Sequence, residues 1–280
     1  MDKLLLVDGS NLLFQMFYGM PQRIINSRGK AIHGTLGFIG ALGKILRMVS
    51  PTHVAVLFDG ECENKRVEMD PQYKANRPDY SQIPEEETPF SQLPDIYMAL
   101  DYMSIAHRET TNCETDDWIA AYTKALDGSS QIVISSQDSD YFQLISQNVH
   151  ILRYRGKNTA IWDADTLYQR FGIAPEQYAD FKALTGDASD NIKGVPGIGP
   201  KTAAMLINRF GSLEEIIANG SRISKPAIRE SLICSCEQLR NNYRLIRLEG
   251  LEALPFPMES LVYTPRDLTT SQILAAIGLK

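Results

Sequence analysis

The sequence is poor in cysteine and histidine, and it lacks any long hydrophobic run. Neither residue type has the paired spacing of a metal site, and the four cysteines are Cys62, Cys113, Cys234 and Cys236. We therefore expect reduced thiols and no zinc. The first apolar run, residues 4–7, ends at Asp8, too early for a signal peptide or a membrane span. The sequence predicts a cytoplasmic protein with no membrane partner.

Several catalytic motifs are missing, and so is an excess of positive charge. There is no Gly-x-Ser-x-Gly elbow, no Gly-x-x-x-x-Gly-Lys-Ser/Thr loop and no Gly-x-Gly-x-x-Gly turn after a strand. The net charge of −6 is unusual for a nucleic-acid-binding protein, because phosphate binding usually needs a basic surface. Nine carboxylates in one metal site would, however, leave +3 on the rest of the chain. The distribution of charge therefore matters more than the total.

The order of apolar segments predicts an α/β fold. Strand-length apolar runs cover residues 4–7, 53–58, 131–135 and 149–154, and helical patterns lie between them at residues 34–49, 93–103 and 116–126. This alternation is typical of a parallel sheet with helices on both faces. After about Pro175 the strand patterns end and helices separated by glycine turns follow. We expect an α/β domain over residues 1–174 and a helical region over residues 175–280.

Residues 61–94 differ from the rest of the first domain. The segment is polar, contains five prolines and includes the acidic run Glu85–Glu87, so we do not expect it to be part of the core. Connections of this length are usually functional or disordered.

Acidic residues follow three of the predicted strands. Asp8, Asp59 and the pair Asp138 and Asp140 come after the first three, and a further acidic group opens the helix near residue 116. Each acid alone is most simply a turn residue or a helix cap. Parallel strands, however, bring their carboxyl ends to one edge, and gathered carboxylates must be protonated or bind cations. Hard oxygen ligands suit Mg²⁺ or Mn²⁺, and two such ions can hydrolyse a phosphodiester without a nucleophilic side chain.

A glycine-rich turn follows two more acids in the helical region. Gly186-Asp187-Ala-Ser-Asp190-Asn191 leads into a segment with glycines at positions 194, 197 and 199, followed by Lys201 and Thr202. Glycines before a helix can leave backbone amides pointing at an anion. Residues 186–210 are therefore interpreted as a helix-hairpin-helix element that holds a DNA phosphate.

Together these motifs resemble the 5′-nuclease or flap endonuclease family, whose members include the domain fused to bacterial DNA polymerase I. They cover residues 4–210 in the family's order: Val7-Asp8-Gly9, Phe58-Asp59-Gly60, Tyr73-Lys74-Ala75-Asn76-Arg77-Pro78, Glu114-x-Asp116-Asp117, Asp138-x-Asp140 and Gly186 to Thr202. The resemblance implies a PIN-like nuclease core, a helical arch at residues 61–94, and 5′-3′ exonuclease or 5′-flap endonuclease activity on DNA. It also implies a free-standing nuclease that acts as a monomer.

The resemblance assigns roles to nine acids. One metal would be surrounded by Asp8, Asp59, Glu114 and Asp116, and the other by Asp138, Asp140 and Asp187. Asp117 and Asp190 would act mainly through waters. The cofactors would be two or more Mg²⁺ ions, with Mn²⁺ able to substitute.

Further residues are implied to contact DNA or potassium. Lys74 and Arg77, three apart on a helix, would steer the scissile phosphate, and Tyr73 would stack on an unpaired base. The duplex would be held by Gly197, Gly199, Lys201 and Thr202. A K⁺ ion would lie near the carbonyls of Ile192, Val195 and Ile198.

This chain departs from the family's usual pattern at three positions. Gln15 stands where an arginine is common, and Gln137 and Ser139 flank Asp138 where relatives often have Gly-Asp-Lys-Asp. All nine acids are present. Two alternatives remain open: a DNA-structure-binding paralogue with weak catalysis, and a nuclease of similar fold that acts on RNA.

Overall fold

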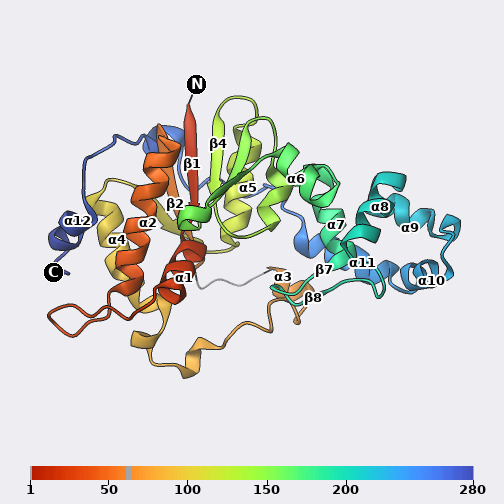
Figure 1. The fold of residues 1–280 in the computed structure, drawn as a ribbon, viewed down its shortest axis with the longest axis horizontal. Coiled ribbons are helices and arrows are strands. Elements are labelled where there is room, and N and C mark those ends of the chain that lie inside the picture. The colour runs from red at the N-terminus through yellow and green to blue at the C-terminus, as the bar shows by residue number, and fades with distance from the viewer. Residues whose placement is uncertain (1, 61–64, 280) are drawn as a thin grey trace.

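The computed structural model describes residues 2–60 and 65–279, and its central feature is a six-stranded sheet (Figure 1). The strand order is β3-β2-β1-β4-β5-β6, with the first five strands parallel and β6 antiparallel to β5. The strands are β1 (Lys3–Asp8), β2 (His53–Phe58), β3 (Ala106–Glu109), β4 (Gln131–Ser135), β5 (Val149–Arg153) and β6 (Ala160–Trp162). The predicted α/β fold and its four strands are confirmed. The two edge strands, β3 and β6, were not predicted, because neither has a long apolar run.

Both faces of the sheet are buried, so its central strands are apolar throughout. Leu4 and Leu6 of β1 contribute to the core on one face, while Leu5 and Val7 contribute to the core on the other. The first face packs against α5 (Thr115–Ala125), and the second packs against α1 (Gly9–Gly19), α2 (His33–Val49) and α4 (Leu93–Tyr102). The apolar runs found in the sequence are therefore those of a doubly covered sheet.

The helical region continues from the α5 face of the sheet without a break in the core. One buried cluster runs from Leu4 and Ile119 through Leu184 to Leu206 and Leu239. The helices are α6 (Ala164–Phe171), α7 (Tyr178–Thr185), α8 (Pro200–Phe210), α9 (Leu213–Ala218), α10 (Pro226–Cys234) and α11 (Cys236–Ile246). A two-stranded ladder, β7 (Gly186–Asp187) and β8 (Ile192–Lys193), lies between α7 and α8. The expectation that strands end before this region is thus wrong for these two short strands.

The last thirty or so residues leave the helical region and return to the sheet. Val262 bridges to His53, and the Tyr263 amide donates to the Thr52 carbonyl at 2.8 Å. Helix α12 (Thr270–Ala276) then packs against α2 and α4, at the opposite end of the molecule from α8, α9 and α10 (Figure 1). The sequence did not predict this return, in which a 3₁₀ turn at Met258–Leu261 comes before the bridge to β2.

Residues 65–92 run along the carboxyl edge of the sheet, from α3 (Lys65–Met69) to α4 (Figure 1). The acidic run Glu85–Glu87 forms an exposed 3₁₀ turn, as its composition suggests. Thr88 and Gln92, however, are buried, and the Gln92 side chain accepts from the Thr35 hydroxyl at 3.1 Å. The segment therefore contributes to the core at its end, contrary to expectation. Residues 61–64 of the expected arch lie outside the described residues.

Two remaining expectations concern thiols and membranes. Cys234 and Cys236 are thiols in the structure, as expected. Cys62 lies outside the described residues. No helix within residues 2–60 and 65–279 is both long and apolar enough to cross a membrane.

Candidate functional site

A cavity of about 530 Å³ opens at the carboxyl ends of β1, β2 and β4. Parallel strands place the residues that follow them at this edge, which is where α/β sheets bind ligands. The acids that line the cavity are Asp8, Asp59, Glu114, Asp116 and Asp138. Predicted site residues that are up to 130 positions apart in the sequence are therefore neighbours in the structure.

Asp8 shows that a helix cap and a site residue can be the same side chain. Its Oδ1 accepts from the Asn11 amide at 2.9 Å, which caps α1, and its Oδ2 accepts from the Ser136 hydroxyl at 3.0 Å and the Tyr141 hydroxyl at 3.2 Å. Burial, reinforced by the negative charge of Asp59, raises the pKa of Asp8 to about 7. The next residue must be glycine, because a Cβ on Gly9 would lie 2.5 Å from the Phe58 ring.

The first turn of α5 supplies three acids to the same region. Glu114 and Asp117 form a capping box, and the Thr115 amide donates to Asp59 at 2.9 Å. This contact joins the end of β2 to the start of α5. Burial raises the pKa of Asp116 well above its ordinary value; Arg66 opposes this shift, and the charges of Glu114 and Asp117 add to it.

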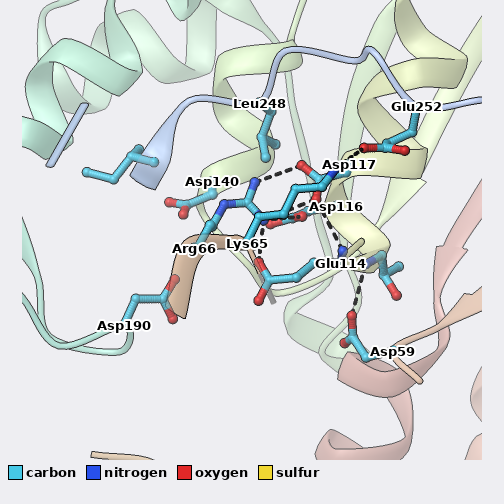
Figure 2. A network of polar contacts seen from close by, with 12 residues as sticks. Asp59, Lys65, Arg66, Glu114, Asp116, Asp117, Asp140, Asp190, Leu248 and Glu252 are labelled. Atoms are coloured by element: carbon cyan, nitrogen blue, oxygen red, sulfur yellow. Dashed lines mark hydrogen bonds and ion pairs between the residues drawn. The ribbon is translucent and has the colours of Figure 1, made fainter. Parts of the chain in front are cut away.

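Arg66 of α3 lies among these acids, and sequence reasoning missed it. Its NH1 group is 2.5 Å from Glu114 and 3.4 Å from Asp116, and its NH2 group is 2.7 Å from Asp117. Figure 2 shows the guanidinium directed into the group of carboxylates from α5. The side chain is only 10% exposed, so its charge acts in a poorly screened environment. Nothing in its local sequence, a basic pair in a polar stretch, distinguishes it from a solvated residue.

A second acidic cluster lies on the α7 side of the site. Carboxylate oxygens of Asp140, Asp187 and Asp190 come within 4.8 Å of one another. The resemblance had assigned Asp138, and not Asp190, to the same metal ion as Asp140 and Asp187. Asp138 instead accepts a hydrogen bond from the Asp140 amide at 2.9 Å and lines the cavity with the first group of acids.

Lys182 of α7 is the internal cation of this second cluster. Its ammonium group is 2.9 Å from Asp140 and forms a close ion pair with Asp187. Burial raises the pKa of Asp140 to about 7 although Lys182 opposes the shift. Burial also acts to raise the pKa of Asp187, but Lys182 and hydrogen bonds from Ser189 hold it below its ordinary value. A lone lysine in the otherwise largely apolar segment Tyr178–Thr185 was the signal that could have identified it.

Tyr73, Lys74 and Arg77 reach the site, but they do not lie on a helix. Residues 71–76 form turns, and Lys74 has a left-handed backbone with φ of 57°. The predicted shared helix face is therefore wrong. Lys74 is 2.5 Å from Glu114, and Arg77 is 3.0 Å from Asp190, so the two cations contact different parts of the acidic site.

Tyr73 is not available to stack on a base in this structure. Its side chain is 5% exposed, and its hydroxyl donates to Glu114 at 3.1 Å and to Asp190 at 3.3 Å. Its ring also lies 4.7 Å from the Lys74 ammonium. Tyr73 therefore holds the two halves of the acidic site together, which corrects the expected stacking role.

The glycine turn before α8 is exposed and has an open backbone. Gly197 has φ of +82°, and a Cβ at Gly197 or Gly199 would meet no atom within 4 Å. Gly199 is the N-cap of α8, and Lys201 and Thr202 lie in its first turn. The side chains of Ile192, Val195 and Ile198 are buried beneath this turn, and the Val195 carbonyl accepts from the Ile198 amide at 3.0 Å.

The glycine turn is held close to Asp187 by a backbone contact that leaves no room for a side chain. Gly186 has φ of +80°, and a Cβ there would lie 2.4 Å from the Gly194 nitrogen. Only glycine permits this approach. The acidic cluster and the hairpin are consequently joined through one short β ladder.

Known protein families match nearly the whole chain. Residues 3–172 match the 5′-3′ exonuclease, N-terminal resolvase-like domain, and residues 173–269 match the 5′-3′ exonuclease, C-terminal SAM fold. DNA polymerase I of Rhizobium leguminosarum is 34% identical over 276 residues, which is 95% of this chain and 26% of that protein. The thermostable DNA polymerase I of Thermus aquaticus is 35% identical over 88% of this chain and 28% of its own length. The chain thus spans about a quarter of the length of these relatives.

Solved structures show the same fold. The T5 D15 protein co-crystallised with metal ions has a TM-score of 0.72 at 27% identity, with 88% of this chain and 89% of that chain covered. The bacteriophage T5 D15 flap endonuclease in a pseudo-enzyme-product complex with DNA and metal ions has the same TM-score and coverage at 26% identity. The catalytic core of Rad2 with a DNA substrate shares the fold at 17% identity, with a TM-score of 0.62 and 99% and 93% of the two chains covered. This chain belongs to the 5′-3′ exonuclease family.

Proposed function

We propose that this protein is a 5′-3′ exonuclease and structure-specific 5′-flap endonuclease that hydrolyses DNA phosphodiester bonds with two or more Mg²⁺ ions. The observation that carries the proposal is the convergence of acids from three strand ends, the start of α5 and the Gly186–Asn191 loop at one edge of the sheet. Its family supports the reaction type. The T5 neighbours, which were solved with metal ions and DNA, support the cofactor class and the substrate.

The residues present fit divalent metal ions. Asp140, Asp187 and Asp190 offer three carboxylate oxygens within 4.8 Å, with the Lys182 ammonium group beside two of these acids. Such hard ligands favour Mg²⁺, with Mn²⁺ as a substitute. The remaining acids would hold a second ion directly or through waters: Asp8, Asp59, Glu114, Asp116, Asp117 and Asp138. Bound divalent ions supply activation of water and neutralisation of charge at phosphorus.

Cations of the chain itself act on the substrate in this proposal. Lys74 and Arg77 lie at the cavity and would leave their carboxylate partners to contact the scissile phosphate. Charge placed there stabilises the more negative transition state more than the bound substrate. Tyr73 would keep Glu114 and Asp190 in place through its hydroxyl.

The hairpin would hold duplex DNA outside the cavity. Gly197 and Gly199 keep the backbone accessible, and Lys201 and Thr202 open α8, whose N-terminus favours a phosphate. The carbonyls of Ile192, Val195 and Ile198 would hold a K⁺ ion beneath the turn. We expect the protein to act as a monomer.

A cleavage assay tests the function and separates the alternatives. A 5′-labelled flap DNA, the matching RNA and a blunt duplex are incubated with Mg²⁺ or EDTA. We expect cleavage of the flap DNA near the junction with Mg²⁺ and none with EDTA. Binding without cleavage would instead identify a catalytically weak DNA-structure-binding protein, and preferential cleavage of the RNA would identify an RNA nuclease.

A further inference from the structure

The loop that follows β5 is anchored at a single carbonyl group. The Tyr154 carbonyl accepts from the Gln15 side-chain amide at 2.7 Å and from the Gln137 side-chain amide at 2.9 Å. Gln15 belongs to α1 and Gln137 follows β4, so two elements beside the acidic cavity hold the same point of the loop.

Gln137 also fixes the guanidinium of Arg155. The Arg155 Nε group donates to the Gln137 side-chain oxygen at 2.8 Å, while the Gln137 amide donates to Asn11 at 2.9 Å. Asn11 lines the acidic cavity, and Asp138 is the next residue in the chain after Gln137. Arg155 is therefore held by a side chain whose own backbone is hydrogen-bonded to a residue that lines the cavity.

The orientation of Arg155 leaves its terminal groups open. The residue is exposed, and within residues 2–60 and 65–279 its side chain makes no hydrogen bond other than the one through Nε. A guanidinium held at Nε presents NH1 and NH2 as a fork that matches the oxygens of a phosphate. The contact with Gln137 also reduces the rotamer freedom that would be lost on binding.

The two chain neighbours of Arg155, Tyr154 and Gly156, line a basic groove. It has a volume of about 440 Å³, and the described residues that line it are Lys44, Arg47, Met48, Tyr154, Gly156 and Lys157. None of these residues is acidic, although the chain as a whole has a net charge of −6. A groove whose charged wall residues are all cations attracts polyanions.

We propose that Arg155, together with Lys157 and Arg47, forms a second phosphate subsite that binds the DNA strand beyond the metal centre. Gln15 and Gln137 are its positioning residues, since they hold the loop and the guanidinium. This inference rests on the proposed function, because it assumes that the cavity receives DNA. Arg155 contacts a phosphate that does not react, so it contributes to binding of substrate and transition state alike.

The subsite predicts a change in affinity with little change in chemistry. Arg155→Ala should raise KM for the flap DNA about tenfold and leave kcat within about twofold, since uniform binding is lost. Affinity measured with Ca²⁺ should fall by a similar factor, and its dependence on salt should weaken by about one phosphate contact. Arg170→Ala is the matched control, because Arg170 is an exposed arginine of α6, outside the loop that follows β5.

A second variant separates the charge at position 155 from a structural effect. Arg155→Lys retains a cation at this position, so it should keep part of the affinity that Arg155→Ala loses. Unchanged affinity and salt dependence in Arg155→Ala would overturn the subsite, and so would an equal loss of affinity in Arg155→Lys in a protein of unchanged melting temperature. Neither result would affect the proposed function, which fails only if the unmodified protein does not cleave DNA with Mg²⁺.

Discussion

The acidic cavity and the glycine turn before α8 are built in opposite ways. The cavity collects side chains from segments spread over most of the chain, and cations of the same chain, Arg66, Lys74 and Lys182, lie among its acids. The turn is a local feature of about ten residues. It presents backbone groups to a ligand and has no internal counter-charge. The cavity therefore depends on the complete fold, whereas the turn depends mainly on glycine.

Loss of an acid in the cavity should give the largest effect. Asp116→Ala should lower turnover by roughly three orders of magnitude or more, because a metal ligand is removed, and should leave DNA affinity equal or tighter because repulsion is relieved. Single-turnover cleavage of flap DNA and a binding titration in Ca²⁺ measure the two effects. Asp127→Ala, an exposed acid just after α5, should behave like the unmodified protein. Near-normal cleavage by Asp116→Ala would remove the metal role of the α5 acids.

Loss of Lys74 should have a smaller effect that falls on turnover. Lys74→Ala should reduce kcat about ten- to a hundredfold, because charge at the reacting phosphate stabilises the transition state most, and should change affinity much less. Lys65→Ala removes a neighbouring lysine that is 70% exposed and serves as the control. If only the dissociation constant rose, Lys74 would steer DNA without acting at the scissile phosphate.

A side chain on the glycine turn should affect binding and not chemistry. Gly199→Val should weaken binding to all duplex-containing substrates about tenfold and slightly reduce the salt dependence, because the turn grips phosphate without reading bases. The substitution tests the surface and not the fold, since a Cβ at this position meets no atom within 4 Å. Gly19→Val is the control, because Gly19 is an exposed glycine of α1 whose added Cβ would also meet no atom within 4 Å. An equal loss for short single strands would contradict a duplex grip.

The metal-free protein should become less stable as the pH rises through 7. The pKa values of Asp8 and Asp140 are raised to about 7, so their protonated forms stabilise the fold below that pH and the benefit is lost above it. The two acids together should lower the free energy of unfolding by roughly 1–3 kcal/mol between pH 6 and pH 8. This loss corresponds to a fall of several degrees in Tm. Mg²⁺ should remove most of the dependence by binding the ionised acids. A metal-free Tm that rises from pH 6 to pH 8 would contradict the assignment.

The acidic turn Glu85–Glu87 should have the smallest effect. Changing all three residues to glutamine should tighten DNA binding two- to threefold at low salt, and the gain should disappear at high ionic strength because the charges are exposed and screened. Affinity titrations at two salt concentrations measure it. An unchanged affinity at low salt would place this turn away from the DNA path.

The same contrast explains which parts of the molecule could be predicted. Strand-end acids such as Asp8 and Asp138 were predictable, because the parallel sheet brings strand ends to one edge. The turn around Gly199 was predictable because its conformation is local. Arg66 and Lys182 were not, since a single cation reaches the site through tertiary packing. The turn conformation of Lys74, with its positive φ, and the return of the chain at Val262 likewise depend on long-range contacts.

The two-metal proposal depends on how many divalent ions the acidic site binds. Mn²⁺ can be titrated into the protein held on a non-cleavable flap DNA and counted by electron paramagnetic resonance, with Asp140→Asn as a variant of the second cluster. We expect at least two ions per chain, loss of at least one in Asp140→Asn, and, on a cleavable flap of the same sequence, a cleavage rate that rises with occupancy of both sites. Full cleavage by a protein that binds one ion or none would contradict the two-metal proposal.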